Sequence, residues 1–171
     1  MRAARVFRWA VRIFVLFLTL TMSIVSFLGG LSAVNILTNP SNVQIDTSSV
    51  VFEYEPTAPE DTNLSVPFYI NNVGYFDLNG LTIGIDITMI YNTTVERRIF
   101  NKTNQFPDIP AGRDLSDSFD AFNGDGFNLP EAQNIAPSPT PIFAANISLF
   151  ARYSLDLLSF NVRIENQTFT P

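Results

Sequence analysis

The stretch Leu81-Thr82-Ile83-Gly84-Ile85-Asp86-Ile87-Thr88-Met89-Ile90-Tyr91 decides the fold. Every odd position in it is apolar or aromatic, and positions 82, 84, 86 and 88 are small or polar. Strict alternation of this kind is typical of a β-strand that buries one face and exposes the other. The sequence therefore predicts that Ile83, Ile85 and Ile87 lie in a core and that Asp86 faces solvent.

Further segments on both sides of this strand are also rich in β-formers and are separated by Gly, Pro and Asn turns. We predict strands over residues 50–54, 64–70, 95–100, 115–122, 143–155 and 160–164, with Leu115 and Phe119 facing inward. The proline-rich stretch 129–141 is expected to be a loop, and residues 101–104 resemble a turn. Seven strands without intervening helical patterns predict an all-β, antiparallel β-sandwich.

The N-terminal region has a different character. Four of the ten basic residues lie within the first twelve positions, and the first acidic residue is Asp46. Residues 13–34 carry no charge and would extend about 33 Å as a helix, enough for a hydrocarbon core of roughly 30 Å. Thr19, Thr21, Ser23 and Ser26 can donate their hydroxyls to the helix backbone, so they do not prevent insertion.

These features predict a domain order along the chain. Residues 1–12 form a basic cytoplasmic tail, 13–34 a transmembrane helix, 35–45 a linker and 46–171 the β-sandwich domain. The one-sided arginines place the N-terminus in the cytoplasm of a cell-membrane protein and the sandwich outside it. A cleaved signal peptide is the alternative, because Gly30-Leu31-Ser32 offers a cleavage site before Ala33.

Composition excludes several classes of function. The chain has no cysteine and no histidine, which excludes disulfides, thiolate or imidazole zinc sites, and catalytic triads that use either residue. Without the four N-terminal arginines, the chain has six basic and sixteen acidic residues, which gives a net charge of about −10. Such an acidic body repels nucleic acid, so we expect no nucleic-acid partner. We also expect no cofactor.

Three short segments resemble the late-embryogenesis-abundant type 2 family, also called the water-stress and hypersensitive-response domain. They are 69–81 (YINNVGYFDLNGL), 106–112 (FPDIPAG) and 151–155 (ARYSL), within a region of similarity over about 46–165. The resemblance implies an immunoglobulin-like or fibronectin-like sandwich, often behind one N-terminal membrane helix, with no catalytic residues. The family's Asn-Pro-Asn start is only approximated by Asn39-Pro40-Ser41-Asn42.

An acidic stretch gives a weak candidate calcium site at Asp114, Asp117, Asp120 and Asp125. The EF-hand template does not fit, because with Gly126 at its sixth position the first and twelfth positions would be Ala121 and Ala132. Aspartates on a solvated strand edge and in a glycine turn are the simpler interpretation. We therefore expect no metal to be needed.

Carboxylates could also support hydrolysis of a glycoside. The candidates are scattered over the predicted strands and loops: Glu53, Glu55, Asp86, Glu96, Glu131 and Glu165. A Ser-Lys pair would need Lys102, the only lysine, which falls in the turn-like stretch 101–104. An enzyme is therefore not expected, and a secreted or anchored carboxylate-dependent hydrolase is the alternative function.

Five Asn-x-Ser/Thr sequons follow the membrane segment, at Asn63, Asn92, Asn101, Asn146 and Asn166. On the translocated side of a membrane these are candidate N-glycosylation sites, with Asn92 and Asn101 expected in turns. Within the helix, Ser26 with Gly30 and Gly29 with Ala33 form small-xxx-small pairs that would permit self-association. The function expected is non-enzymatic display of a binding or structural domain to a protein or cell-envelope partner.

Overall fold

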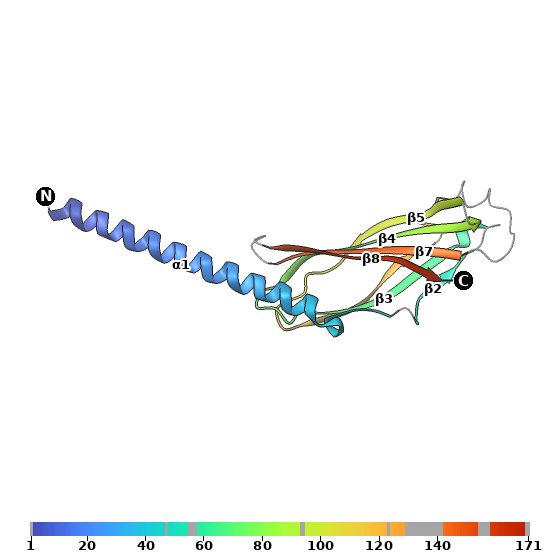
Figure 1. The fold of residues 1–171 in the computed structure, drawn as a ribbon, viewed down its shortest axis with the longest axis horizontal. Coiled ribbons are helices and arrows are strands. Elements are labelled where there is room, and N and C mark those ends of the chain that lie inside the picture. The colour runs from blue at the N-terminus through green and yellow to red at the C-terminus, as the bar shows by residue number, and fades with distance from the viewer. Residues whose placement is uncertain are drawn as a thin grey trace.

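The computed structural model describes residues 2–46, 48–54, 58–92, 95–122, 124–128, 142–153 and 158–169. In this part of the chain a long helix precedes a β domain (Figure 1). The helix and the two 3-10 turns are α1 (Arg2–Thr38), η1 (Pro40–Asn42) and η2 (Pro59–Asp61). The strands are β1 (Val43–Ile45), β2 (Val51–Glu53), β3 (Asn63–Asn71), β4 (Leu78–Asn92), β5 (Val95–Gln105), β6 (Asp114–Ala121), β7 (Ile142–Tyr153) and β8 (Ser159–Phe169).

The strands form two antiparallel sheets. In the first, which we call sheet A, β3 pairs with β6 along one edge and with both β1 and β2 along the other. In the second, sheet B, the order is β5-β4-β7-β8. Buried residues of both sheets belong to one hydrophobic cluster, so the sheets face each other across a common core. The all-β prediction is confirmed at this level, whereas the immunoglobulin-like assignment stays a prediction.

The alternation in β4 is confirmed. Leu81, Ile83, Ile85, Ile87 and Met89 are each at most 3% exposed, and the residues between them are half-buried on the outer face. The predicted inward position of Phe119 on β6 is also confirmed, at 0% exposed.

One expectation for β4 needs correction, because Asp86 is half-buried rather than fully exposed. Its side chain is 21% exposed, since Arg98 and Asn101 from β5 lie against it. The neighbouring strand therefore supplies the partners that cover this carboxylate.

Two local expectations differ from the structure. Residues 101–104 are not a turn: they lie within β5 and pair with β4, because their outward Asn and Thr side chains fit a polar strand face. An eighth strand, β1, lies in the stretch expected as a linker, which also holds the end of α1 and η1. The expected loop 129–141 and Leu155 of the expected sixth strand lie outside the described residues.

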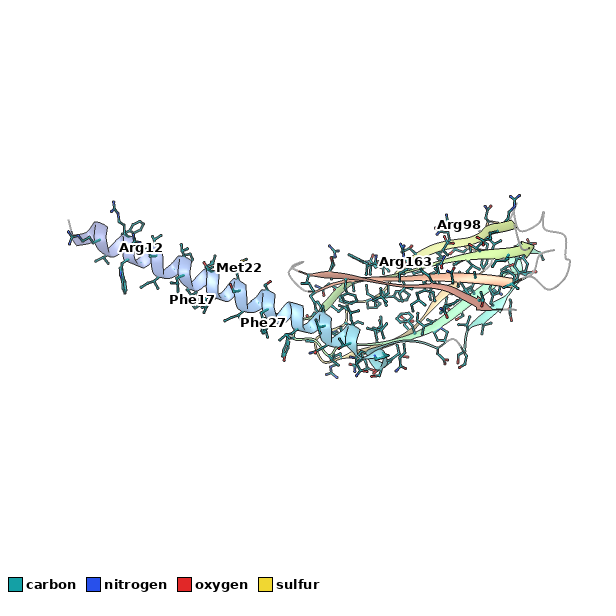
Figure 2. All side chains as sticks on the ribbon, viewed as in Figure 1. Arg12, Phe17, Met22, Phe27, Arg98 and Arg163 are labelled. Carbon is teal, nitrogen blue, oxygen red and sulfur yellow. The ribbon has the colours of Figure 1, made fainter. Side chains whose placement is uncertain are left out.

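The helix has two parts with different surroundings. Its first part projects away from the sandwich with apolar side chains on all sides, among them Phe17, Met22 and Phe27 (Figure 2). The hydroxyls of Thr19, Thr21 and Ser23 donate to backbone carbonyls one turn earlier, as expected. Residues Arg5–Thr38 have a mean hydropathy of 2.2 in their most apolar window, long and apolar enough to span a membrane or to act as a signal anchor.

The second part of the helix belongs to the β domain. Ser32, Ala33 and Ile36 are 0%, 7% and 1% exposed, and the last two join the common core. Asn42 in η1 continues this contact by donating its side-chain amide to the carbonyl of Asn35 at 3.0 Å. The last turns of the helix therefore pack one face against the sandwich rather than leading into a free linker.

Candidate functional site

The outer face of sheet B carries a polar groove with a volume of about 430 Å³. Polar side chains from β4, β5, β7 and β8 line it, because the even positions of β4 and their cross-strand partners all face away from the core. Figure 2 shows Arg98 and Arg163 on this side of the sheet, turned away from sheet A. We call this feature the sheet B groove.

Gly84 forms part of the floor of the sheet B groove. A Cβ at this position would lie 2.8 Å from the Ser148 hydroxyl and 3.0 Å from the Thr103 hydroxyl, so no larger residue fits without displacing them. The Ser148 hydroxyl donates to the Gly84 carbonyl at 3.3 Å. A glycine in a strand interior often marks such a close approach. The floor is therefore narrow and rich in hydroxyls.

Asp86 is the central charge of the groove. Its Oδ2 atom accepts from the Arg98 Nε at 2.7 Å and from the Asn101 side-chain amide at 3.0 Å. Asn101 and Asn146 are its cross-strand partners in β5 and β7. The Arg98 side chain is 65% exposed, so its remaining donors are open to a ligand.

A second polar pair lies where β7 meets β8. The register shifts between Ala145 and Ile147, and Asn166 adopts a left-handed φ of 56°. The Asn146 Oδ1 accepts from the Asn166 backbone amide at 2.9 Å, which stabilises this irregularity. Asparagine tolerates the left-handed region better than most residues. The irregularity lies next to Asn146 and Glu165, which line the groove.

The predicted glycosylation sites lie on both sheets. Asn101, Asn146 and Asn166 lie around the sheet B groove. Asn101 lies within a strand rather than in the expected turn, while Asn92 ends β4 and its side chain lies outside the described residues. Asn63 begins β3 on sheet A and donates to Glu53 at 3.3 Å.

The four candidate calcium ligands do not form a cluster. Asp114, Asp117 and Asp120 lie along β6, with Asp117 exposed on the opposite parity from the other two. Asp120 accepts from the hydroxyls of Ser65 and Ser118, and Asp125 forms an ion pair with Lys102 at 2.8 Å. Within the described ranges no three acidic side chains are close enough together to hold a metal ion.

Of the carboxylates considered for hydrolysis, the structure brings two, Asp86 and Glu165, into one groove. Glu53 and Glu96 are exposed on β2 and β5, while Glu55 and Glu131 lie outside the described residues. Asp86 and Glu165 both line the groove, and each lies beside an arginine, Glu165 at 3.6 Å from Arg163. Lys102 is half-buried and donates to the Asp120 carbonyl at 3.0 Å.

Sequence reasoning missed the contact between the helix and the sandwich. We call the loop Asn72–Phe76 the junction loop. The Asn72 side chain is 0% exposed, donates to the carbonyls of Phe76 and Ile109, and accepts from the Gly74 amide. The Tyr75 amide donates to the Ser32 hydroxyl at 2.9 Å. The Asn-Asn-Val-Gly sequence indicated a turn here, but nothing local indicated its distant partners.

Tyr153 packs beneath the junction loop. Its ring is 1% exposed and lies near Phe160, and its Cε1 would be 3.0 Å from a Cβ at Gly74. Its hydroxyl has no hydrogen-bond partner among the residues that the structure describes. Burial raises the pKa of this phenol well above its ordinary value of 10.0, because the charged form would be desolvated.

Comparisons with known proteins give no family. No family model matches the sequence, and no curated protein matches it. A solved structure described as the ApaA protein of Bordetella pertussis is similar at a TM-score of 0.33 and 10% identity, over 75% of this chain and 85% of that chain. This distant likeness assigns no family, and the resemblance to late-embryogenesis-abundant type 2 proteins stays a prediction.

Proposed function

We propose that the chain is a non-enzymatic, single-pass membrane protein that holds an acidic β-sandwich outside the cytoplasm for binding or structural contact. The observation that carries the proposal is the continuity of α1. One helix runs from an exposed apolar segment directly into the core of the sandwich, where Ile36 is 1% exposed. An exposed apolar surface of this size is unstable in water and requires a lipid environment.

The same contact favours a retained anchor over a cleaved leader. Cleavage before Ala33 would remove Ser32, whose hydroxyl accepts from the Tyr75 amide. It would also leave Ala33 and Ile36 at a frayed chain end, although both are buried in the core. Loss of these contacts would destabilise the β-sandwich domain after it had crossed the membrane. We therefore propose that α1 remains attached.

The orientation follows from charge. Arg5, Arg8 and Arg12 lie at the end of α1 remote from the sandwich, and the excess of acidic residues lies in the sandwich. The positive-inside rule then puts the N-terminus in the cytoplasm and the domain on the other side of the cell membrane. The resemblance to late-embryogenesis-abundant type 2 proteins implies the same order of helix and sandwich. On that side the sequons become candidates for glycosylation.

The sheet B groove is the surface we propose for contact with a protein or cell-envelope partner. It offers hydroxyls, amides and the exposed Arg98, which are suited to polar recognition. A carboxylate-dependent hydrolase is less well supported, because Asp86 and Glu165 each have an arginine beside them. Self-association through α1 is also limited, since Ala33 of one small-residue pair is buried against the sandwich.

The absence of cysteine makes the topology simple to test. Single-cysteine variants Val6→Cys and Phe122→Cys place a thiol at positions that are 68% and 52% exposed, one near the N-terminus and one on the sandwich. A membrane-impermeant maleimide added to intact cells should label Phe122→Cys and reach Val6→Cys only after permeabilisation. The reverse pattern would refute the orientation, and an intact mass beginning after Ser32 would refute retention of the helix.

The groove can be tested in the same background. Thr103→Cys on the outer face of sheet B and Ser116→Cys on sheet A are both exposed and can carry a photo-crosslinker. In intact cells we expect discrete adducts from Thr103→Cys and none above background from Ser116→Cys. Equal labelling from both positions would argue against the groove as the contact surface.

A further inference from the structure

The junction loop presents apolar side chains outward at the end of the sandwich where α1 enters. Val73 and Tyr75 are 40% and 59% exposed, whereas Gly74 between them and Asn72 before them are buried. A loop exposed only to water would more commonly show the opposite pattern, with polar residues outside. Packing within the domain does not account for the outward position of Val73 and Tyr75, because both side chains are exposed.

The loop is held in this conformation and cannot simply turn Tyr75 inward. Three hydrogen bonds from the Asn72 side chain fix its backbone. A Cβ at Gly74 would lie 2.9 Å from the Ser32 Cβ, so the loop backbone lies directly against the helix. The hydrogen bond from the Tyr75 backbone amide to the Ser32 hydroxyl then places Tyr75 level with Ser32 along the axis of α1.

That height coincides with the expected edge of a bilayer. The uncharged segment begins at Ile13, and the helical rise from Ile13 to Ser32 is about 29 Å, close to the roughly 30 Å of a hydrocarbon core. With Arg12 at one boundary, Ser32 and therefore Tyr75 lie at the other. Phe27, 66% exposed one turn or more below Ser32, is at a depth that belongs to the acyl chains.

We propose that Val73 and Tyr75 of the junction loop insert into the lipid interface on the translocated side, as a second membrane contact beside the helix. Tyrosine suits this region because its ring is apolar and its hydroxyl stays hydrated. The partner is the headgroup layer of the same bilayer that α1 spans, so the inference rests on the proposed membrane anchoring. It gives the sandwich a fixed inclination against the membrane surface.

The test uses tryptophan fluorescence of the full chain in phosphatidylcholine vesicles. Trp9 is the only tryptophan, so Trp9→Phe gives a silent background. Into it are placed Tyr75→Trp, the helix position Met22→Trp and the sandwich position Phe122→Trp, all exposed sites at which a larger ring fits. Tyr75→Trp retains the backbone bond to Ser32, because that bond uses the amide.

Lipids brominated near the headgroup or deep in the acyl chain then report depth. We expect the headgroup-side bromines to quench Tyr75→Trp by at least half and to leave Phe122→Trp unquenched, while the deep bromines quench Met22→Trp. Tyr75→Trp behaving like Phe122→Trp would overturn the inference while leaving the anchor intact. An unquenched Met22→Trp would instead refute the membrane span itself.

Discussion

The Ser32 hydroxyl in α1 accepts a hydrogen bond from the backbone amide of Tyr75, forty-three positions later, at 2.9 Å. The bond is accompanied by burial of Ala33 and Ile36 in the core that both sheets share. Helix and sandwich are thus one packed unit at this point.

Gly74→Ala should destabilise the folded domain. The added Cβ would meet the Asn72 Oδ1 and the Ser32 Cβ at 2.9 Å and the Tyr153 ring at 3.0 Å. Overpacking of this kind costs about 1–3 kcal/mol, which lowers the melting temperature by roughly 3–10 °C. Thermal unfolding in detergent micelles measures this. Gly30→Ala is the matched control, because its Cβ would meet nothing within 4 Å, and equal effects would contradict the described contact.

Asn72→Ala should be more damaging than Asn71→Ala. The first leaves the carbonyl of Phe76 and the amide of Gly74 without their side-chain partner. Each buried polar group left unpaired costs about 1–3 kcal/mol. Denaturant unfolding should show a loss of at least about 2 kcal/mol for Asn72→Ala. Asn72→Asp keeps an acceptor for Gly74 but places a carboxylate oxygen against the carbonyls of Phe76 and Ile109, so it should be at least as damaging as Asn72→Ala. An Asn72→Ala variant as stable as the natural chain would show that the side chain is dispensable.

Ile85→Asp should prevent folding of the sandwich. Ile85 is 2% exposed in the central strand β4, and an unpaired buried carboxylate costs several kcal/mol, comparable to the whole stability of a domain. Thr103→Asp, on the exposed outer face of the neighbouring strand β5, is the control and should fold like the natural chain. Circular dichroism distinguishes the two, and a native spectrum for Ile85→Asp would contradict the described strand parity.

Tyr153→Phe should make the domain less sensitive to alkali. The pKa of Tyr153 is raised in the folded state, so the unfolded chain loses its phenolic proton first as the pH rises. Above pH 10 the free energy of unfolding therefore decreases, because the unfolded chain is stabilised by losing this proton. Below pH 10 the phenol is protonated in both states, and this loss of stability does not occur. The variant lacks this titration, so its melting temperature should fall less between pH 9 and pH 11. Tyr75→Phe, at a ring 59% exposed, should behave like the natural chain.

Calcium should have little effect on unfolding. Asp120 and Asp125 already have partners in Ser65, Ser118 and Lys102, and Asp117 faces the other way along β6. Melting temperatures in excess calcium and in a chelator should agree within roughly 3 °C. A shift of roughly 10 °C or more would show tight binding to the native state and assign these aspartates as ligands.

The alternation of apolar residues made the strands predictable. From Leu81 to Met89 in β4 the sequence parity matches the burial pattern residue by residue, because one face of the strand packs on the core. The burial pattern of β7 departs from the same parity at Ala144, which is also buried. The three-residue strand β1 was not predicted, since Val43–Ile45 is too short to show a period. The expected domain start at Asp46 therefore omits a strand that pairs with β3.

The candidate sites were harder to predict than the strands. Residues 101–104 look like a turn because Asn and Thr are common in turns, yet they lie in β5, where Asn101 and Thr103 line a polar groove. The end of α1 looks like membrane span throughout, because lipid and a protein core favour the same apolar residues. Only the tertiary fold shows that Ile36 faces protein while Phe27 does not.

The position of β8 has a mechanical consequence. α1 joins one end of the sandwich, and β8 runs to the opposite end, where the chain finishes (Figure 1). A partner that pulls on that end, against a helix anchored in a bilayer, would apply force along the strands. The hydrogen bonds between β7 and β8 lie perpendicular to the strands, so this force shears the whole ladder from Phe143 to Arg152 at once. Loading in shear requires these hydrogen bonds to break together, whereas opening the ladder from one end would break them one pair at a time.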